Sequence, residues 1–466
     1  MATSIETQVT VVGAGISGLT TAFYLKTVGL GVEVLEKSPR VGGTIDTRHK
    51  DGYLIDCGPN SALETTPLLG EMFATLDIED SLRYASEDAR NRYIVRDSRL
   101  IALPMSPPAF FKTPLFSAGA KLRLLKEPFV RPSPPETDED LASFVERRLG
   151  REMLDYAINP FVSGVYAGRP EALSVRAAFP RLYELEQNYG SLIKGTIKGR
   201  RERRKRESAG ENSKQSARMF SFTGGMQTIV DALEERLGES VRTGVTIDAI
   251  RRRDSGFEVD ATSASGAITI RTERLLLSIP AYAVPDLPFE FDVPVAEALG
   301  SITYPPVTMI FLGFDSFPGG RPLDGFGFLV PEKEGRRILG TIWSSTLFEN
   351  RAPVAGAGLT TFIGGARQPE LANLSDPELT AIVLSDLREL MGVTKDPDLV
   401  YIRRWPRAIP QYDVGHLDIV RTLESVEAEI PGLHITGNFR GGISVSDCVK
   451  SARAVASGIA EVYNRK

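Results

Sequence analysis

The chain has 466 residues, of which 42% are hydrophobic and 25% are charged, the composition of an ordinary globular protein with room for about two to four structural units. Its 55 basic and 60 acidic residues give a net charge of −5, which excludes a globally basic nucleic-acid binder. Two cysteines and three widely separated histidines argue against a disulfide scaffold and a zinc–thiolate site, so we expect no metal and look for an organic cofactor. No apolar run is long enough to span a membrane and no signal peptide is evident, so a cytoplasmic location is expected.

The first part of the chain predicts a strand, a glycine turn, a helix and a second strand. Residues 8–12 form a β-branched run, residues 19–28 have helical periodicity, and the turn between them reads Gly13-Ala14-Gly15-Ile16-Ser17-Gly18. Glycines here permit a tight turn and close backbone approach, so that a pyrophosphate can bind at the helix N-terminus. The second strand ends in Glu36, whose carboxylate can accept both ribose hydroxyls of an adenosine and would repel a 2′-phosphate. The pattern predicts a Rossmann-like dinucleotide site.

A second glycine pair distinguishes FAD from NAD as the dinucleotide. Glu36 is followed by Lys37 and then by Arg40, Gly42, Gly43 and Thr44. A Rossmann dehydrogenase needs no glycine pair at this place, whereas the longer FAD runs onward past the first motif. There an arginine can neutralise phosphate and glycines let the backbone approach the ligand. A further predicted strand ends in Gly58-Pro59-Asn60-Ser61, whose backbone amides can reach the flavin end, so we predict FAD.

The middle of the chain departs from this pattern. Residues 91–104 predict a hairpin, and residues 138–149 predict a capped amphipathic helix. Residues 107–126 join an apolar stretch to a short basic one, which fits either a surface that dips into a membrane interface or the core of a helical unit. Residues 159–168 predict a glycine-punctuated loop, and the basic and polar stretch at 194–216 predicts an exposed loop.

Strands return in the second half of the chain. Short strands at 241–247, 257–260, 267–270 and 274–280 bring the chain back to the dinucleotide domain, and those at 302–314, 325–330, 338–344 and 359–363 predict the sheet of a substrate-facing unit. Near the end, a strand and a glycine turn precede a helix that starts near Ser444, and its positive end can face the flavin. The chain has no second GxGxxG motif. We therefore expect an organic substrate to reduce the flavin directly and oxygen to re-oxidise it.

Together these motifs resemble the amine-oxidase-like FAD superfamily, and within it the protoporphyrinogen oxidase family. The N-terminal motif is generic to flavoproteins, but several later strings are specific to the family, and the resemblance covers nearly the whole chain. These strings lie at residues 159–168, 220–227, 339–345, 350–353, 361–366, 405–410 and 414–416.

From this we expect an α/β fold (α+β overall) with three units. A Rossmann-like FAD-binding domain is built from the discontinuous segments 1–85, 218–285 and 405–466. A mixed-sheet substrate-binding domain comprises residues 86–95 and 286–404. Residues 96–217 form a helical domain, which is the candidate for membrane association.

The resemblance also implies a reaction, the six-electron oxidation of protoporphyrinogen IX to protoporphyrin IX in haem and chlorophyll synthesis. Non-covalently bound FAD accepts hydride, three O₂ become three H₂O₂, and no side chain acts as acid or base. Arg92 would pair with a substrate propionate, and Gly164 would offer its backbone to the pyrrole NH groups. Further substrate contacts are implied for Leu329, Ile342 and Phe362, and further cofactor contacts for Val245, Trp405, Ile443, Ser444 and Val445. The family pattern tolerates leucine at the position of Ile342, which leaves the pocket shape open there.

Alternatives remain open at the sequence level. A related coproporphyrinogen III oxidase acts on a tetrapropionate, and Arg92 favours the dipropionate substrate over it. A flavin amine oxidase would need an aromatic pair beside the flavin that the sequence does not reveal, and a flavoprotein without turnover is the remaining alternative. Besides the porphyrinogen and O₂, the expected partners are a membrane surface, ferrochelatase as the recipient of the product, and a second copy in a homodimer, but no nucleic acid. Attachment to the cytoplasmic membrane would be peripheral.

Overall fold

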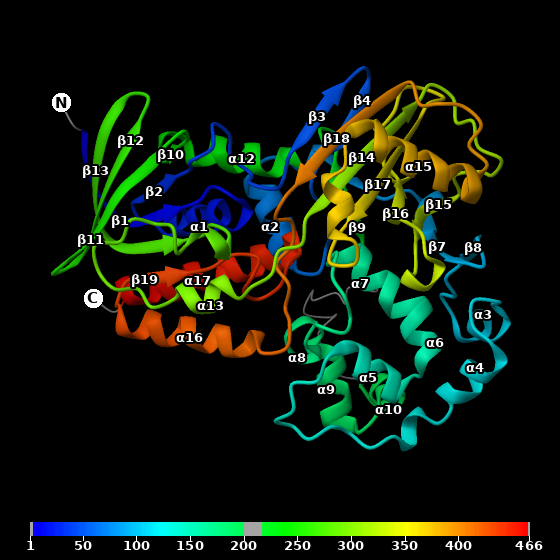
Figure 1. Cartoon of the computed structure of the whole chain (residues 1–466). Helices are drawn as coiled ribbons and strands as arrows, with labels where there is room; N and C mark the ends of the chain where they lie inside the picture. Colours follow the sequence, from blue (N-terminus) through cyan, green and yellow to red (C-terminus); the bar gives the residue numbers. More distant parts are fainter. Residues whose placement is uncertain (1–2, 200–216, 465–466) are drawn as a thin grey trace.

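The computed structural model describes residues 3–199 and 217–464, and it contains two large sheets, helices packed against them and a separate group of helices (Figure 1). This arrangement confirms the predicted α/β class. Within the described residues, no helix is long and apolar enough to cross a bilayer.

The first sheet carries the dinucleotide motif. Its strand order is β10-β2-β1-β13-β12-β11, and β19 also pairs with β13. The strands are β1 (Thr3–Val12), β2 (Val32–Leu35), β10 (Val241–Arg242), β11 (Thr246–Arg253), β12 (Gly256–Ser263), β13 (Gly266–Leu277) and β19 (Leu433–Ile435). The β10, β2, β1, β13 and β19 neighbours are parallel, as crossover helices require, and β11 to β13 form an antiparallel meander.

Helices cover both faces of this sheet. Helix α1 (Ile16–Thr27) packs against α12 (Gln227–Leu237) and α17 (Val445–Asn464) on one face, and α16 (His416–Glu429) packs on the other. Strand β1 supplies residues to both cores, because side chains alternate along a strand: Val9 and Val11 lie in the α1 core and Val12 in the α16 core. The helices predicted after Gly18 and near Ser444 are confirmed as α1 and α17.

The second sheet has the order β18-β14-β17-β16-β15-β7-β8. Its strands are β7 (Asn91–Arg96), β8 (Arg99–Ala102), β14 (Val307–Phe314), β15 (Gly325–Leu329), β16 (Ile338–Trp343), β17 (Ala357–Gly364) and β18 (Leu399–Trp405), and α15 (Asp376–Met391) covers one face. All pairs are antiparallel except β15 with β7. The predicted hairpin is confirmed as β7–β8. Both of its strands belong to this sheet, although β8 lies within residues 96–217, which were expected to form the helical domain. The division of the chain into three units stays a prediction.

Short elements connect the two sheets. They comprise the hairpin β3 (Thr47–Lys50) and β4 (Tyr53–Asp56), the small sheet of β5 (Ala62–Leu63), β6 (Leu82–Tyr84) and β9 (Met219–Phe222), and the helices α2 (Pro67–Thr75), α13 (Ala296–Gly300) and α14 (Ser344–Leu347). At the end of β4, Asp56 forms a buried ion pair with Arg351, which follows α14, with 3.2 Å between Oδ2 and Nη2. The pair therefore links the first half of the molecule to the second sheet.

The helical region contains α3 (Pro107–Lys112), α4 (Ala118–Leu124), α5 (Leu141–Arg148), α6 (Arg151–Met153), α7 (Asn159–Val165), α8 (Val175–Ala178), α9 (Pro180–Tyr189) and α10 (Leu192–Lys198). Helix α5 confirms the predicted capped helix, because the Asp140 side chain accepts a hydrogen bond from Ser143 N. The loop expected at 159–168 is wrong over most of its length, because residues 159–165 are helical. Helix α7 continues directly from a π-helical turn at Leu154–Ile158, and such a bulge accommodates the missing N–H of Pro160. Of the loop expected at 194–216, residues 194–198 belong to α10 and residues 200–216 lie outside the described residues.

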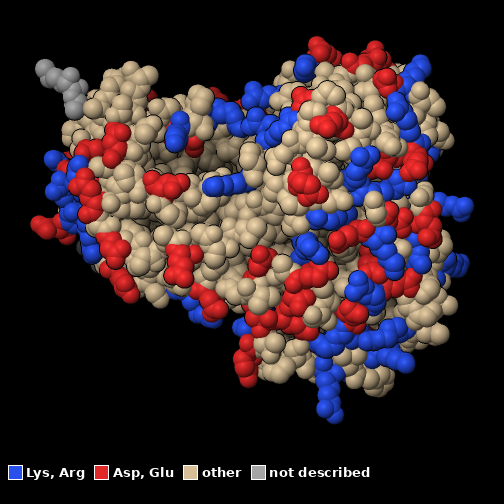
Figure 2. Space-filling view, viewed as in Figure 1, with Lys and Arg blue, Asp and Glu red and all other residues tan. Residues whose placement is uncertain are grey.

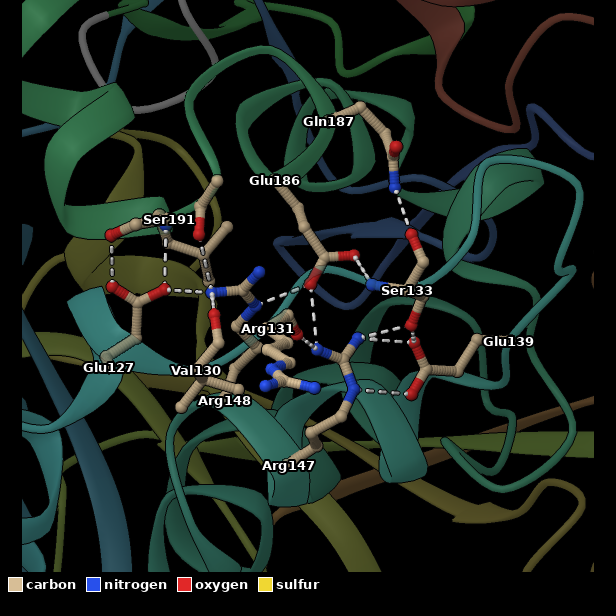
Figure 3. Close-up of polar contacts among 12 residues, drawn as sticks. Glu127, Val130, Arg131, Ser133, Glu139, Arg147, Arg148, Glu186, Gln187 and Ser191 are labelled. Atoms are coloured by element: carbon tan, nitrogen blue, oxygen red, sulfur yellow. Dashed lines mark hydrogen bonds and ion pairs between the residues drawn. The ribbon is translucent and has the colours of Figure 1, made fainter.

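A buried ionic network holds the helical region together (Figure 3). The Arg148 side chain, at the end of α5, is 0% exposed and contacts two carboxylates, Glu127 at 3.0 Å and Glu186 at 2.5 Å. Glu186 also accepts a hydrogen bond from Arg147 at 2.9 Å, so its carboxylate lies between two guanidinium groups. Ser191 donates to Glu127 as well, which joins α10 to the same cluster.

We expect Arg148→Met to lower the free energy of unfolding by about 3–5 kcal/mol, because it leaves two buried carboxylates without their shared cation. Arg151→Met is the matched control. Arg151 pairs with Asp155 but is 66% exposed, and an exposed pair contributes less than about 1 kcal/mol. Urea unfolding followed by circular dichroism compares the two variants. Equal unfolding midpoints would show that the network contributes no stability.

Candidate functional site

The turn between β1 and α1 leaves an open space at one glycine and none at its neighbours. A Cβ added at Gly13 would lie 2.6 Å from Ser278 O, and a Cβ at Gly18 would overlap the carbonyl oxygen of Gly13. At Gly15 an added Cβ would meet no atom within 4 Å. The first turn of α1 also has no side-chain cap, so its backbone N–H groups are available to a ligand. The open space and the uncapped amides together fit the pyrophosphate of a dinucleotide.

The second glycine pair lies directly against this turn. Gly42 N donates to Ala14 O at 2.8 Å, and a Cβ added at Gly43 would approach Gly15 Cα to 3.5 Å. The Arg40 guanidinium turns inward and donates to the carbonyl oxygens of residues 41, 43 and 45 at 2.7 to 2.9 Å. In this structure Arg40 therefore stabilises the loop through these hydrogen bonds. The two glycine turns contact each other through their backbones, with no side chain between them.

Glu36 lies where the predicted adenosine end of the site would be. Its carboxylate accepts hydrogen bonds from Ala14 N and from Ser38 N, both at 2.8 Å, and its carbonyl oxygen accepts from Val245 N at 2.9 Å. Each carboxylate oxygen keeps a second lone pair with which it can accept a ribose hydroxyl. The structure thus brings Glu36 and Val245 together with the first glycine turn, and Lys37 beside them is exposed. Figure 2 shows a hollow in the surface over β2 and α1, bordered by basic side chains.

The other predicted cofactor residues border the far end of the same region. Gly58 packs on Thr44, because a Cβ there would overlap Thr44 O, and Trp405 Nε1 donates to Cys57 O at 2.9 Å. The N-terminus of α17 lies beside that of α1, since the buried Cys448 thiol interacts with the Ser17 side chain. The structure therefore gathers residues 13–18, 42–44, 58–61, 405 and 443–445 around one region, although their contacts with FAD stay predictions.

One face of the second sheet carries the predicted substrate residues in two cross-strand rows. Register places Arg92, Gly327, Ile342 and Thr360 in one row, and Ile94, Leu329, Gly340 and Phe362 in the next. Paired residues share a face, and residues two apart on a strand do so as well. Leu329, Ile342 and Phe362 are each partly exposed on strands that are otherwise largely buried. The three apolar side chains thus lie on one face. At Gly327 and Gly340 in the same rows an added Cβ would collide with a neighbouring strand, at Thr341 O and Phe328 O respectively.

Helix α7 approaches this face through Gly164. A Cβ added at Gly164 would lie 2.5 Å from Leu329 Cδ2, so a larger residue here would have to displace the Leu329 side chain. The same face adjoins the cofactor region, because Asn60 and Ile342 line a common hollow with Ser344 and Thr360.

Arg92 stands at the edge of the face with its guanidinium over the Phe326 ring, 5.7 Å from the ring centroid. The Arg92 side chain is exposed to solvent, and desolvation by its neighbours lowers its pKa. Among the described residues, no carboxylate lies within ion-pair distance of it. Its guanidinium can therefore receive the carboxylate of a ligand.

Sequence reasoning missed Arg367, which fixes the approach of α7. Its guanidinium donates to Val330 O at 3.0 Å and to Ser163 Oγ at 2.9 Å, next to Leu329 and Gly164 respectively. Burial lowers the pKa of Arg367. A charged residue directly after the Gly-Gly-Ala string at 364–366 was the available signal, but nothing in the sequence indicated its partners.

Comparison with known proteins assigns the family. The sequence pattern of flavin-containing amine oxidoreductases matches residues 16–460. The chain therefore belongs to the flavin-containing amine oxidoreductase family. Membership confirms the predicted flavin, and the dinucleotide-type site identifies it as FAD, so the chain is an FAD-dependent oxidoreductase.

Within this family the chain is similar to porphyrinogen oxidases. It is 34% identical over 478 residues to the chloroplastic protoporphyrinogen oxidase of Nicotiana tabacum, an alignment that covers 99% of this chain and 86% of the relative. It is 28% identical over 468 residues to the coproporphyrinogen III oxidase of Bacillus subtilis (strain 168), which covers 97% of each chain. A crystal structure of a candidate protoporphyrinogen oxidase from Exiguobacterium sp. 255-15 has a TM-score of 0.81 at 27% identity, covering 98% of this chain and 99% of that chain. These relatives confirm the resemblance found in the sequence.

We expect Gly15→Val to fold normally but to lose FAD. The backbone at Gly15 is extended, with φ −72° and ψ 173°, so valine fits the fold, but its side chain would fill the space in front of α1. Gly18→Ala is the contrasting variant, because its methyl group overlaps Gly13 O and should damage the fold itself. Flavin absorbance per protein and far-UV circular dichroism separate the two effects. Wild-type flavin content in folded Gly15→Val would place the pyrophosphate elsewhere.

Proposed function

We propose that this protein is an FAD-dependent oxidase that converts protoporphyrinogen IX to protoporphyrin IX. The observation that supports this most directly is Arg92, a cation without a carboxylate partner among the described residues, at the edge of an apolar face beside the cofactor region. A porphyrinogen has the matching shape, a large apolar macrocycle with carboxylates along one edge.

In this proposal the protein acts by positioning. FAD, when bound, accepts the electrons of the substrate and passes them to O₂, so that three O₂ become three H₂O₂ for each macrocycle. Leu329, Ile342 and Phe362 hold the macrocycle by apolar contact and exclude water from it. Gly164 lies in the last turn of α7, where carbonyl groups lack helical partners, and its C=O can accept a hydrogen bond from a pyrrole N–H.

Non-covalent attachment of the FAD belongs to the same proposal. Burial raises the pKa of the thiols of both Cys57 and Cys448 to about 11, so each stays protonated at neutral pH. The thiolate is the nucleophilic form of cysteine, and neither residue is therefore activated for bonding to a flavin.

Coproporphyrinogen III is the second candidate substrate, and the full-length similarity to the Bacillus subtilis enzyme favours it. An aerobic assay with each porphyrinogen, followed by porphyrin fluorescence and H₂O₂ release, decides between them. The proposal expects a higher kcat/KM with protoporphyrinogen IX. A preference for the tetrapropionate would assign the second function, and no turnover of either substrate would reject both.

We expect Arg92→Ala to raise KM roughly 30- to 150-fold, because a charge-assisted hydrogen bond to a propionate contributes about 2–3 kcal/mol. Arg92→Lys should recover only part of the loss, since an ammonium lacks the planar fork of a guanidinium. Steady-state kinetics measure both variants, with the flavin spectrum unchanged.

Arg99→Ala serves as the control for Arg92. Arg99 is an exposed arginine on the same hairpin, in β8, and its removal should leave KM unchanged. If Arg92→Ala and Arg99→Ala behaved alike, Arg92 would not bind the substrate, and the preference for the dipropionate would lose its support.

We also propose peripheral attachment to a membrane through the helical region. The stretch at residues 107–126, expected to be either a membrane surface or a core, is partly buried and partly exposed. Leu115 and Phe116 are buried core residues, whereas an apolar edge formed by Phe111, Leu122, Leu125 and Phe129 is exposed, with Phe129 84% exposed. Lys121, Arg123 and Lys126 belong to the same stretch, and basic residues beside exposed apolar ones suit an anionic lipid surface.

A cytoplasmic location, product transfer to ferrochelatase and a homodimer also stay predictions.

Replacing Leu125 and Phe129 together by serine should reduce binding to vesicles that contain phosphatidylserine several-fold without unfolding the protein, because both side chains are exposed. Vesicle flotation at low salt gives the bound fraction, and vesicles of phosphatidylcholine alone measure the contribution of charge. A wild-type protein that never floats would show that the apolar edge does not bind lipid.

A further inference from the structure

The glycine turn between β19 and α17 has an unusual backbone. Gly437, Gly441 and Gly442 all have positive φ angles, of 150°, 89° and 123°. An added Cβ would meet Phe439 at the first position, Ser451 at the second and Asp447 at the third. The turn ends at the start of α17, in the region where the flavin is proposed to bind. Such a turn needs external hydrogen bonds, because its backbone groups lie outside any helix or sheet ladder.

Two side chains from the segment that begins α16 supply those hydrogen bonds. The Tyr412 hydroxyl donates to Asn438 O at 2.9 Å and accepts from Gly442 N at 2.8 Å, so it spans the turn. His416 Nε2 lies 2.9 Å from Phe439 O and must donate, because a carbonyl oxygen only accepts. Three backbone groups of one turn are thus satisfied by two residues.

The two rings support each other. Their centroids are 4.1 Å apart with an interplanar angle of 12°, and each residue is only 3% exposed. Burial lowers the pKa of His416, and the contact with Phe439 O places a proton on Nε2. Among the described residues His416 Nδ1 has no hydrogen-bond partner, so the imidazole makes its hydrogen bond to the turn alone.

The same segment is fixed to the substrate side. Tyr412 O accepts from Ser174 N, the cap residue of α8, at 2.8 Å. The neighbouring Gln411 donates to Tyr166 O at 2.8 Å, at the C-terminal end of α7 and two residues after Gly164. Tyr412 therefore contacts the flavin-side turn through its hydroxyl and the helical region through its backbone.

We propose that Tyr412 and His416 are positioning residues that set the flavin-side turn relative to helix α7, and through it the flavin relative to the substrate. The inference rests on the proposed flavin placement. Neither side chain needs to touch the reacting atoms. Their effect is the geometric one that governs transfer between two bound groups, where small displacements cost rate rather than affinity for the substrate.

The first test is Tyr412→Phe, which keeps the stacked ring and removes the hydroxyl that spans the turn. We expect FAD to bind about tenfold more weakly, which corresponds to ~1.4 kcal/mol, and kcat to fall by a similar factor with KM changed less than about twofold. Amide hydrogen exchange in residues 438–442 should accelerate. Tyr183→Phe is the control, because it also removes one hydroxyl bond, to Pro135 O at 2.7 Å, which does not involve the turn.

The second test compares two replacements of His416. Glutamine can place an N–H donor near the position of Nε2, whereas leucine fills the space without a donor. We expect His416→Gln to retain most of the FAD affinity and flavin spectrum and His416→Leu to lose about tenfold in affinity. This comparison stays informative if Tyr412→Phe proves unstable, since thermal melting shows which variants are folded.

The outcomes separate this inference from the proposed function. A wild-type protein that oxidises a porphyrinogen, together with Tyr412→Phe and His416→Leu variants that match it in FAD affinity, exchange rates and kcat, would overturn the inference and leave the function intact. A wild-type protein inactive on every porphyrinogen would reject the function. FAD affinity and hydrogen exchange would then still decide whether the two residues hold the turn.

Discussion

The relative placement of the two sheets depends on the ion pair between Asp56 and Arg351. Asp56 accepts hydrogen bonds from Thr47 Oγ1 at 2.6 Å and Met226 N at 2.9 Å, and Arg351 donates to Ser221 Oγ at 2.7 Å. The pair therefore connects three segments that are far apart in sequence, namely the β3–β4 hairpin, residues 221–226 and Arg351. Burial raises the pKa of Asp56 and lowers that of Arg351, so the cost of desolvation outweighs the stabilisation that each charge gains from its partner. Asp56 and Arg351 line one hollow together with Asn60, from the cofactor half, and Ile342, from the second sheet.

Glycine serves two different purposes around that hollow. At Gly18 and Gly164 it allows protein groups to meet, since a side chain would collide with Gly13 O or with Leu329. At Gly15 it meets nothing, so the space there is available to a ligand rather than to the fold. The distinction between these positions is invisible in the sequence, where all three are glycines, and it separates the part of the motif that builds the protein from the part that binds the cofactor.

The dinucleotide site was predictable because its parts are close in sequence. Gly15 and Glu36 belong to one strand–turn–helix–strand unit, whose local pattern defines the geometry. The supporting contacts were not predictable, because they join distant segments: Arg351 with Asp56, and Tyr412 with the turn at Gly442. Helix α7 was expected to be a loop because glycines punctuate residues 159–168, yet a π-helical turn before it accommodates Pro160 and contact with Leu329 favours glycine. The roles of the apolar trio on the second sheet came from family resemblance alone, since such residues are otherwise ordinary core.

The position of Arg92 has a consequence for how a catalytic cycle would end. Oxidation of a porphyrinogen changes the macrocycle but leaves its propionates untouched, so the guanidinium attracts substrate and product equally. An interaction of equal strength in both states cannot help the product to leave. Departure would then depend on shape, because the substrate is puckered and the oxidised ring is flat and rigid. In the proposed site, Leu329 and Ile342 belong to the surface that this flattening would affect. Turnover would then be limited by the release of the planar product, which would depend on how weakly it binds a face that fits the puckered substrate.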